Sequence, residues 1–227
     1  CAAPRRRPLP GVVAFGHVPR HPMTMSPPSS VRESPTLREL YAAHAGKVSD
    51  KWSLYLDVYE QLLAPFRDRP VAFAEIGVQN GGSLELWARY LPKATVLVGC
   101  DIDPKCGALA FEDPRISVVV GDANTDAAYR AILARAPAFD VFVDDGSHTS
   151  RDIVLAFCNY FRHVRPGGVY VVEDLHCSYR PQWGGGIDRG DTSMEFLKVL
   201  ADFVNLPYWQ RDRAPSTLLD PFFPAGP

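Results

Sequence analysis

Short apolar runs alternate with segments of helical period through most of the chain. The runs lie at residues 71–76, 95–100, 116–120, 139–143 and 169–172, and each leads into glycines or acidic residues. Runs of this length predict buried strands, and helices between them predict parallel pairing. The pattern therefore predicts an α/β fold with a doubly wound, mainly parallel sheet.

Two helical segments precede the first predicted strand. The second carries Leu54, Val58, Leu62 and Leu63 at helical spacing. Apolar residues that recur every three or four positions share one face of a helix, so we expect this face to pack on the core. The two helices are predicted to cover the domain.

The ends of the chain differ in composition from its middle. Residues 1–34 are rich in proline and arginine and contain no acidic residue before Glu33, which predicts a disordered basic tail. The alternatives are a transit peptide or the remainder of an overlong gene model that begins before Met23 or Met25. We expect one domain over residues 35–205, because 227 residues with 46% hydrophobic content can bury one sizeable core. Residues 206–227 are again proline-rich and predict an irregular segment.

Charge and hydropathy exclude several kinds of partner. The formal net charge of −2 provides no basic field for nucleic acid. No run approaches the roughly 20 apolar residues of a membrane helix. The five cysteines form no C-x-x-C pair and predict free thiols in a reducing compartment. We therefore expect a soluble cytoplasmic protein, or an organelle-targeted one if the tail is a transit peptide, and a homo-oligomer is compatible with the sequence.

Acidic residues follow the fourth and fifth predicted strands directly. Asp144, Asp145 and His148 come after one strand, and Glu173 and Asp174 come after the other. Because the carboxyl ends of parallel strands meet at one edge of a sheet, we expect these side chains to converge. Carboxylates that converge repel each other unless a cation neutralises them. The sequence therefore predicts a metal site, and oxygen ligands favour a hard cation such as Mg²⁺.

A glycine-containing turn follows the first predicted strand. Glu75, Gly77 and Gly81 form E-x-G-x-x-x-G, in which a ligand can lie against the backbone at a helix N-terminus. A tight turn without a ligand is the alternative. Asp101 ends the next strand, where a carboxylate can accept hydrogen bonds from a ribose diol, although it could also cap a helix. The turn and Asp101 together favour a nucleoside ligand.

Two further polar residues have alternative roles. Asp122 can accept a hydrogen bond from an exocyclic amine such as that of adenine, or it caps, with Asn124, the helix predicted over residues 126–135. His148 could be a structural neighbour of a helix cap. Its position three residues after Asp145 favours a role as general base.

Residues from about 37 to 203 resemble class I S-adenosylmethionine-dependent methyltransferases, and most closely the metal-dependent sugar O-methyltransferases of macrolide biosynthesis. The matching motifs are Ser49-Asp50-Lys51-Trp52, Glu75-Ile76-Gly77-Val78, Gly121-Asp122, Asp144-Asp145-Gly146-Ser147-His148 and Arg165-Pro166-Gly167-Gly168 through Glu173-Asp174. The glycine turn is widespread among proteins. The D-D-G-S-H motif followed by P-G-G and E-D is the specific part of the resemblance.

The resemblance implies a Rossmann-like methyltransferase sheet and a role for each site residue. Asp145, Glu173 and Asp174 would ligate Mg²⁺, and His148 would be the general base. S-adenosylmethionine would be bound by Glu75, Gly77, Gly81, Ser83, Asp101, Asp122 and Asp144. The expected reaction is Mg²⁺-dependent methylation of a hydroxyl on a small molecule, in particular a sugar of a glycosylated natural product.

Two alternatives to this function stay open on the sequence. A catechol-type methyltransferase would share the cofactor edge but accept a flat phenol. A non-catalytic remnant is suggested by the end of the chain, because such enzymes usually finish with a two-stranded antiparallel hairpin, whereas residues 206–227 contain five prolines. Either this segment is truncated or replaced, or the sheet lacks its last strands.

Overall fold

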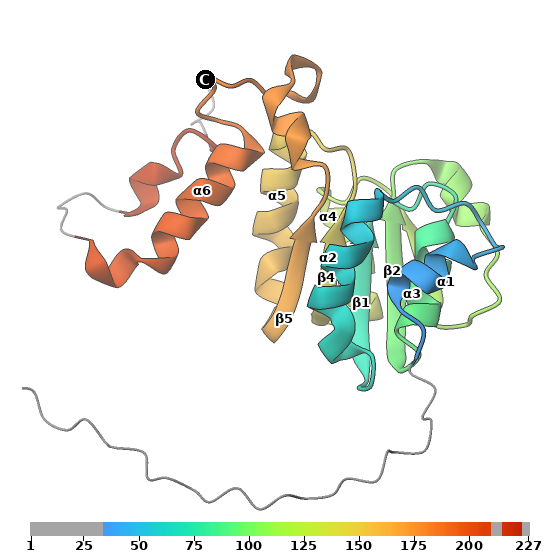
Figure 1. Cartoon of the computed structure of the whole chain (residues 1–227). Helices are drawn as coiled ribbons and strands as arrows, with labels where there is room; N and C mark the ends of the chain where they lie inside the picture. The colour runs from blue at the N-terminus through green and yellow to red at the C-terminus, as the bar shows by residue number, and fades with distance from the viewer. Residues whose placement is uncertain (1–33, 210–214, 224–227) are drawn as a thin grey trace, which may run out of the picture. The chain divides into compact units, whose positions relative to one another are not determined.

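The computed structural model describes residues 34–209 and 215–223 (Figure 1). Pro35–Pro227 forms one compact unit. The tail predicted for residues 1–34 lies outside the described residues except for Ser34, and part of the predicted 206–227 segment does so as well. The account below concerns the described part of Pro35–Pro227.

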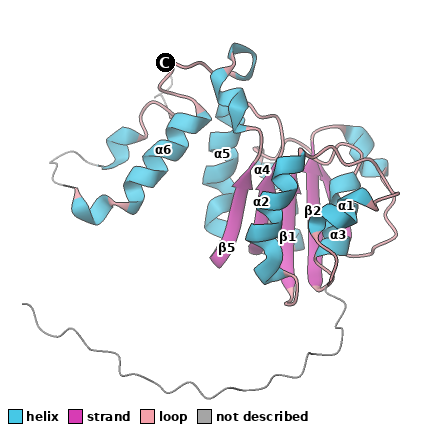
Figure 2. Ribbon diagram, in the orientation of Figure 1, coloured by secondary structure: helices cyan, strands magenta, loops and turns pink. Residues whose placement is uncertain are grey.

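A five-stranded parallel sheet forms the centre of this unit (Figure 2). Its strands are β1 (Val71–Ile76), β2 (Ala94–Asp101), β3 (Ile116–Val120), β4 (Phe139–Asp144) and β5 (Val164–Val172), in the order β3-β2-β1-β4-β5. This arrangement confirms the predicted fold class. No strand follows β5 within the described residues, and the helix α6 (Ser193–Val204) packs near α5 (Ser150–Tyr160) instead.

Helices cover both faces of the sheet (Figure 1). The remaining α-helices are α1 (Leu37–Ala42), α2 (Ser53–Leu63), α3 (Gly82–Tyr90) and α4 (Asp126–Arg135). Short 3₁₀ turns are η1 (Ala64–Phe66), η2 (Pro104–Ala108), η3 (Phe161–His163), η4 (Leu175–Tyr179), η5 (Pro181–Trp183), η6 (Leu206–Tyr208) and η7 (Pro215–Leu218). Each of α1, α4, α5 and α6 begins after a threonine whose side chain accepts a hydrogen bond from the first turn.

Alternating side chains of β1 pack into two hydrophobic clusters, one on each face of the sheet. Phe73 packs with the cluster formed by α1, α2 and α3, whereas Ala72 and Ala74 face the cluster of α4 and α5. All six residues of β1 are buried, as expected for a strand that lies between two neighbours and under helices on both faces. Glu75 is therefore a carboxylate inside the fold.

The helix α2 buries a different stripe from the one that the sequence predicts. Leu56, Tyr59 and Leu63 pack in the core, while Leu54, Val58 and Leu62 are exposed. Of the predicted stripe only Leu63 is buried, so the prediction was wrong for the other three residues, which are exposed. Both stripes have helical spacing. The packing of Tyr59 against Trp87, with ring centroids 4.8 Å apart, selects the buried one.

The strand β5 begins five residues before its predicted start. Phe139 pairs with Val164 but Val141 pairs with Val169, so an irregularity in β5 contains Pro166-Gly167-Gly168. Proline is tolerated there because β5 is the last strand of the described sheet. A Cβ atom on Gly168 would lie 2.7 Å from the Asp140 carbonyl oxygen, which explains this glycine.

The connections that leave the neighbouring strands β1 and β4 run toward opposite edges of the sheet. The chain continues from β1 to β2 on one side, and from β4 to β5 on the other. A crevice forms beyond the carboxyl ends of the strands at such a point. In the described ranges, no helix has the length and apolar character required to cross a membrane.

Candidate functional site

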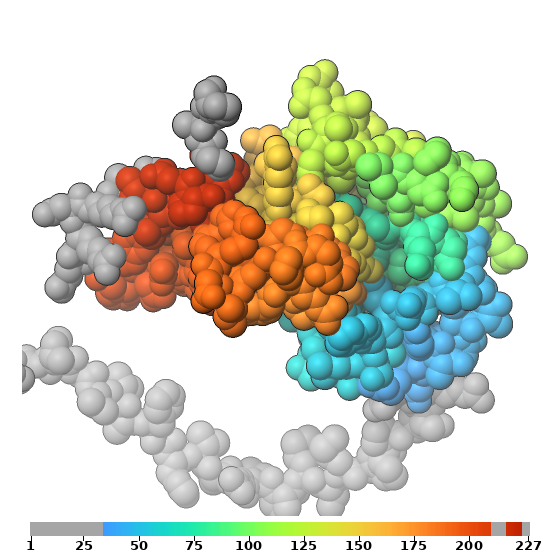
Figure 3. Space-filling model, turned by 90° about the horizontal axis from the view of Figure 1, so that it is seen from above, coloured from blue at the N-terminus to red at the C-terminus, as the bar shows by residue number. Residues whose placement is uncertain are grey.

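A cavity of about 620 Å³ opens at the carboxyl edge of the sheet, and residues that follow each of the five strands line it. Figure 3 looks onto this edge, where segments from the blue, green, yellow and orange parts of the chain meet. Every predicted site residue except Glu75 and Gly81 lines the cavity. Glu75 lies behind the lining residue Ser83, which donates a hydrogen bond to it, and Gly81 is the N-cap of α3.

Three carboxylates from three strands converge beside the cavity. Glu75 of β1, Asp145 after β4 and Glu173 after β5 each offer an oxygen atom, and these atoms lie within 4.8 Å of one another. Glu75 and Glu173 are buried, and Asp145 is partly exposed to the cavity. Three converging oxygen donors suit Mg²⁺ by their chemistry. The sequence predicted Glu75 as a cofactor contact, so its place in this cluster is new.

The ammonium group of Lys51 lies among these carboxylates. Its Nζ atom is 2.6 Å from Asp145 Oδ2, 2.6 Å from Glu173 Oε1 and 3.3 Å from Glu75 Oε1. The hydroxyl of Tyr59 also donates to Glu173 Oε1, at 2.5 Å. Burial raises the pKa values of Glu75 and Glu173, and the positive charge of Lys51 opposes this effect.

Asp174 lies apart from the three-carboxylate cluster. Its Oδ1 atom accepts a hydrogen bond from the Tyr55 hydroxyl at 2.7 Å, and its Oδ2 atom is 3.7 Å from His148 Nε2. Burial and the bond to Asp174 raise the pKa of Tyr55 to about 12, so this phenol stays a donor. The role of Asp174 as a metal ligand stays a prediction, whereas its pairing with His148 is a feature of the structure.

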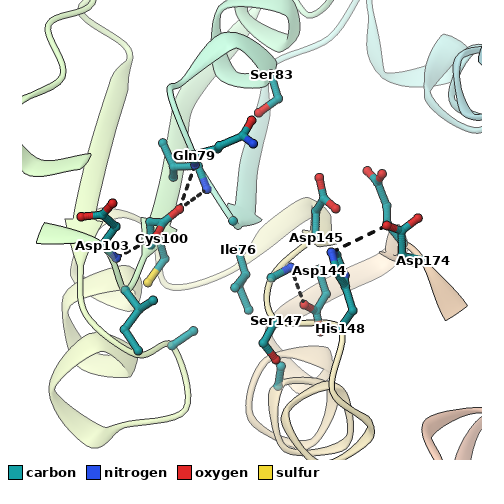
Figure 4. A pocket seen from close by; sticks show the side chains of 18 of the residues that line it. Ile76, Gln79, Ser83, Cys100, Asp103, Asp144, Asp145, Ser147, His148 and Asp174 are labelled. Carbon is teal, nitrogen blue, oxygen red and sulfur yellow. Dashed lines mark hydrogen bonds and ion pairs between the residues drawn. The ribbon is translucent and has the colours of Figure 1, made fainter. Parts of the chain in front are cut away.

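Asp174 and His148 both have left-handed backbone conformations. Their φ angles are 52° and 56°, and Gln79, with φ 52°, is the third such non-glycine residue among the described positions. All three line the cavity. Residues without glycine's freedom are costly in this conformation, and they cluster at functional sites. Figure 4 shows His148 and Asp174 facing each other across the end of β4.

His148 lies next to the N-cap of α5, as the structural alternative predicted, and is not the cap itself. Thr149 is the N-cap of α5, and its side chain accepts a hydrogen bond from the Asp152 backbone N–H. The imidazole is instead directed to Asp174 at the cavity. His176 Nδ1 is 3.9 Å from Asp174 Oδ1, and its ring packs against Trp52 in a tilted arrangement with ring centroids 5.3 Å apart. The two histidines therefore have different surroundings.

The glycines of the turn after β1 are required by packing of the protein itself. A Cβ atom on Gly77, whose φ is 91°, would lie 2.0 Å from the Asp145 carbonyl oxygen. A Cβ atom on Gly81 would lie 2.7 Å from the Phe111 ring. The close approach of Gly77 brings the end of β1 against the start of the acidic loop. Ser83, in the first turn of α3, donates a hydrogen bond to Glu75 Oε2 at 2.6 Å.

Asp101 holds the same turn in place. Its Oδ2 atom accepts hydrogen bonds from the backbone N–H groups of Val78 and Gln79, each at 2.8 Å. Although burial alone would raise the pKa of Asp101, these bonds and one from Asp103 lower it. Asp101 is thus ionised and lines the cavity next to the turn.

The remaining predicted cofactor residues also face the cavity. Asp122 accepts a hydrogen bond from the Asn124 backbone N–H, and Thr125 is the N-cap of α4, so neither Asp122 nor Asn124 is the cap. Asp144 is buried and its Oδ2 atom has no hydrogen-bond partner in the described structure. Burial raises the pKa of Asp144 to about 7.

Comparison with known proteins identifies this fold and cavity. Residues 74–175 match a family model described as a methyltransferase domain. This segment is therefore similar to methyltransferase domains. It contains the second half of β1, all of β2 to β5, the three clustered carboxylates and the glycine turn, so the resemblance drawn from the motifs is confirmed.

Several relatives of this chain are named as O-methyltransferases. The 8-demethyl-8-alpha-L-rhamnosyl tetracenomycin-C 2'-O-methyltransferase of Streptomyces olivaceus is 41% identical over 181 residues, 75% of this chain and 46% of that protein. The mycinamicin VI 2''-O-methyltransferase of Micromonospora griseorubida is 35% identical over 156 residues, 64% of this chain and 38% of that protein. The chain spans about half the length of the curated relatives that it matches.

A solved structure has the same fold. MycE methyltransferase from the mycinamycin biosynthetic pathway, in complex with Mg and SAH, superposes with a TM-score of 0.71 at 30% identity. The likeness covers 82% of this chain and 50% of that chain. A further MycE structure, which also contains mycinamycin VI, gives a TM-score of 0.68 at 32% identity.

Three side chains of the site were missed by reasoning from the sequence. Lys51, Tyr55 and Tyr59 contact the predicted metal ligands, yet they come from a segment that precedes the sheet. Their only signal was the Ser49-Asp50-Lys51-Trp52 motif. Tyr55 and Tyr59 lie one helical turn apart on α2, a spacing that indicates a shared helix face but not its target.

Proposed function

We propose that this domain is an S-adenosylmethionine- and Mg²⁺-dependent O-methyltransferase that acts on a sugar hydroxyl of a glycosylated natural product. One observation supports it above all. The acidic cluster and the His148–Asp174 pair border the same cavity as the glycine turn and Asp101. A methyl donor, a cation and a base are the three components that such a reaction requires.

The names of the relatives support the choice of acceptor and cofactors. One is named as a methyltransferase of a rhamnosyl tetracenomycin and another as a methyltransferase of mycinamicin VI, and MycE was solved with Mg and SAH. The donor set of this chain suits Mg²⁺, because it consists of carboxylate oxygens. Asp145 and Glu173 would hold the ion, with Asp174 as the third predicted ligand.

Side chains of the cavity would take the other roles in the proposed reaction. When bound, Mg²⁺ would supply positive charge that orients and acidifies an acceptor hydroxyl, and S-adenosylmethionine would supply the methyl group. His148 would take the hydroxyl proton, and Asp174, whose Oδ2 atom lies 3.7 Å from His148 Nε2, would stabilise the charged imidazole that results. Asp101 would fix the turn that receives the cofactor and offer its carboxylate to the ribose.

Transfer of a labelled methyl group tests the proposed function. The purified protein is incubated with methyl-labelled S-adenosylmethionine and a panel of glycosides and phenols, with and without Mg²⁺. We expect mass spectrometry to find the label on a sugar hydroxyl only when Mg²⁺ is present. A label on a catechol hydroxyl would favour the phenol alternative, and transfer to no acceptor would favour a non-catalytic domain.

Replacement of Asp101 tests the cofactor edge. We expect Asp101→Ala to weaken S-adenosylmethionine binding by roughly 1.5–3 kcal/mol, because charge-assisted hydrogen bonds are lost. Isothermal titration calorimetry measures this affinity. Asp103→Ala is the control, since Asp103 lines the same cavity but its side chain accepts a bond from Lys105 N. Unchanged affinity in Asp101→Ala, or a preference for NAD, would contradict the assignment.

A further inference from the structure

Lys51 occupies the centre of the acidic cluster although it belongs to a loop before the sheet. Only 2% of its side chain is exposed, and three carboxylates from β1, β4 and β5 surround its Nζ atom at 2.6–3.3 Å. It is the only lysine or arginine among the residues that line the cavity in the described structure. The buried acids therefore have one internal counter-charge.

The charge of this lysine is maintained by its surroundings. Burial alone would lower the pKa of Lys51, but Glu75, Asp145 and Glu173 together raise it far above its usual range. Two of these partners, Asp145 and Glu173, are predicted ligands of Mg²⁺. An ammonium group and a divalent ion cannot both use the same oxygen atoms at close range, because two cations in one buried site repel each other.

We propose that Lys51 is a built-in cation that neutralises the acidic cluster in the absence of metal and gives up Asp145 and Glu173 when a divalent ion binds. The inference rests on the proposed function, since it uses the metal site of that function. Lys51 thus stabilises the metal-free fold and weakens metal binding by competition. The same residue couples the metal site to Glu75, beside the turn for the cofactor.

The exposure of the partners indicates how the exchange proceeds. The side chain of Asp145 is 26% exposed at the cavity, whereas that of Glu173 is 5% exposed. An ion that enters from the cavity meets Asp145 first. Glu75, at 3.3 Å, is the more distant partner of Lys51 and is fully enclosed, so it remains available to the ammonium group after Asp145 and Glu173 are withdrawn.

Neutral replacements of Lys51 test the proposal without any assay of activity. Lys51→Met and Lys51→Gln are compared with the unmodified chain by calorimetric titration with Mn²⁺ and by thermal unfolding, in chelator and in excess Mn²⁺, without cofactor. We expect both variants to bind Mn²⁺ at least about tenfold more tightly, because the competing charge is gone. We expect their unfolding temperature to fall in chelator and to recover in Mn²⁺ more than that of the unmodified chain.

Lys47→Met provides the matched control. Lys47 is partly buried, whereas Lys51 is almost fully buried, and it pairs with one carboxylate, Glu85, outside the acidic cluster. Its replacement should change neither Mn²⁺ affinity nor the gain in unfolding temperature that Mn²⁺ produces. An equal change in Lys47→Met and Lys51→Met would contradict a specific role of Lys51.

The outcomes separate this proposal from the proposed function. If the unmodified chain binds Mn²⁺ and the Lys51 variants bind it no more tightly, only the role of Lys51 fails. Variants that are unfolded in chelator but folded in Mn²⁺ support replacement of one cation by the other. Variants that are unfolded in both conditions overturn it. If no form binds Mn²⁺, the metal site fails and this inference fails with it.

Discussion

His148→Ala is expected to lower the rate of methyl transfer by about 10²–10⁴-fold, the usual contribution of positioned proton transfer. Binding of Mg²⁺ and S-adenosylmethionine should be largely retained, because His148 is not a predicted ligand of either and only faces the predicted metal ligand Asp174 at 3.7 Å. Single-turnover kinetics and equilibrium binding of both ligands would check the two expectations.

His176→Ala is the internal control for this experiment. His176 is also near Asp174, at 3.9 Å, but its ring packs at a tilt against the exposed Trp52. Its replacement should alter affinity for the acceptor more than the chemical step. If His148→Ala keeps the unmodified rate of the chemical step, or if His176→Ala shows the larger loss in that step, His148 is not the base.

Removal of the metal is the second change with a large expected effect. In EDTA, methyl transfer should fall below detection, because the acceptor hydroxyl lacks the positive charge that acidifies it. Transfer should return when excess Mg²⁺ is added. In the variant Asp145→Asn, added Mg²⁺ should not restore methyl transfer. Metal affinity should fall by more than the roughly 10–100-fold that changes around a metal site typically cost, since Asp145 is a predicted ligand itself. The rate at each Mg²⁺ concentration provides the measurement.

Asp57→Asn controls for the loss of one carboxylate. Asp57 lies on the exposed side of α2, where it pairs with Arg38, and does not line the cavity. The methyl-transfer rate of Asp57→Asn and the response of that rate to Mg²⁺ should equal those of the unmodified chain. S-adenosylmethionine affinity should stay largely intact in both variants. Full turnover in EDTA would exclude the metal from the reaction.

Local patterns were sufficient to determine the order of the elements. The strands β1 and β3 and the helix α4 have the predicted bounds, since apolar runs, turn residues and helical periods are properties of neighbouring residues. The parallel order then places the residues after β4 and β5 on one edge. For that reason the sequence alone located Asp145, His148, Glu173 and Asp174 at one site.

The tertiary structure decided which side chains meet within that site. Glu75 joined the acidic cluster because β1 lies directly beside β4, and Asp145 follows the strand paired with it. Gly77 was explained by the backbone of Asp145, and the buried stripe of α2 by Trp87. Each of these facts depends on which element packs against another, and periodicity contains no information on the partner.

Lys51 shows this limit most clearly. Ninety-four positions separate it from Asp145 and 122 separate it from Glu173, yet its ammonium group is 2.6 Å from each carboxylate. The sequence determined that a cation was needed where parallel strands bring carboxylates together, because like charges repel at any such edge. That a lysine from the preceding loop could supply this cation was decided by the fold, which alone brings distant segments of the chain within the range of a hydrogen bond.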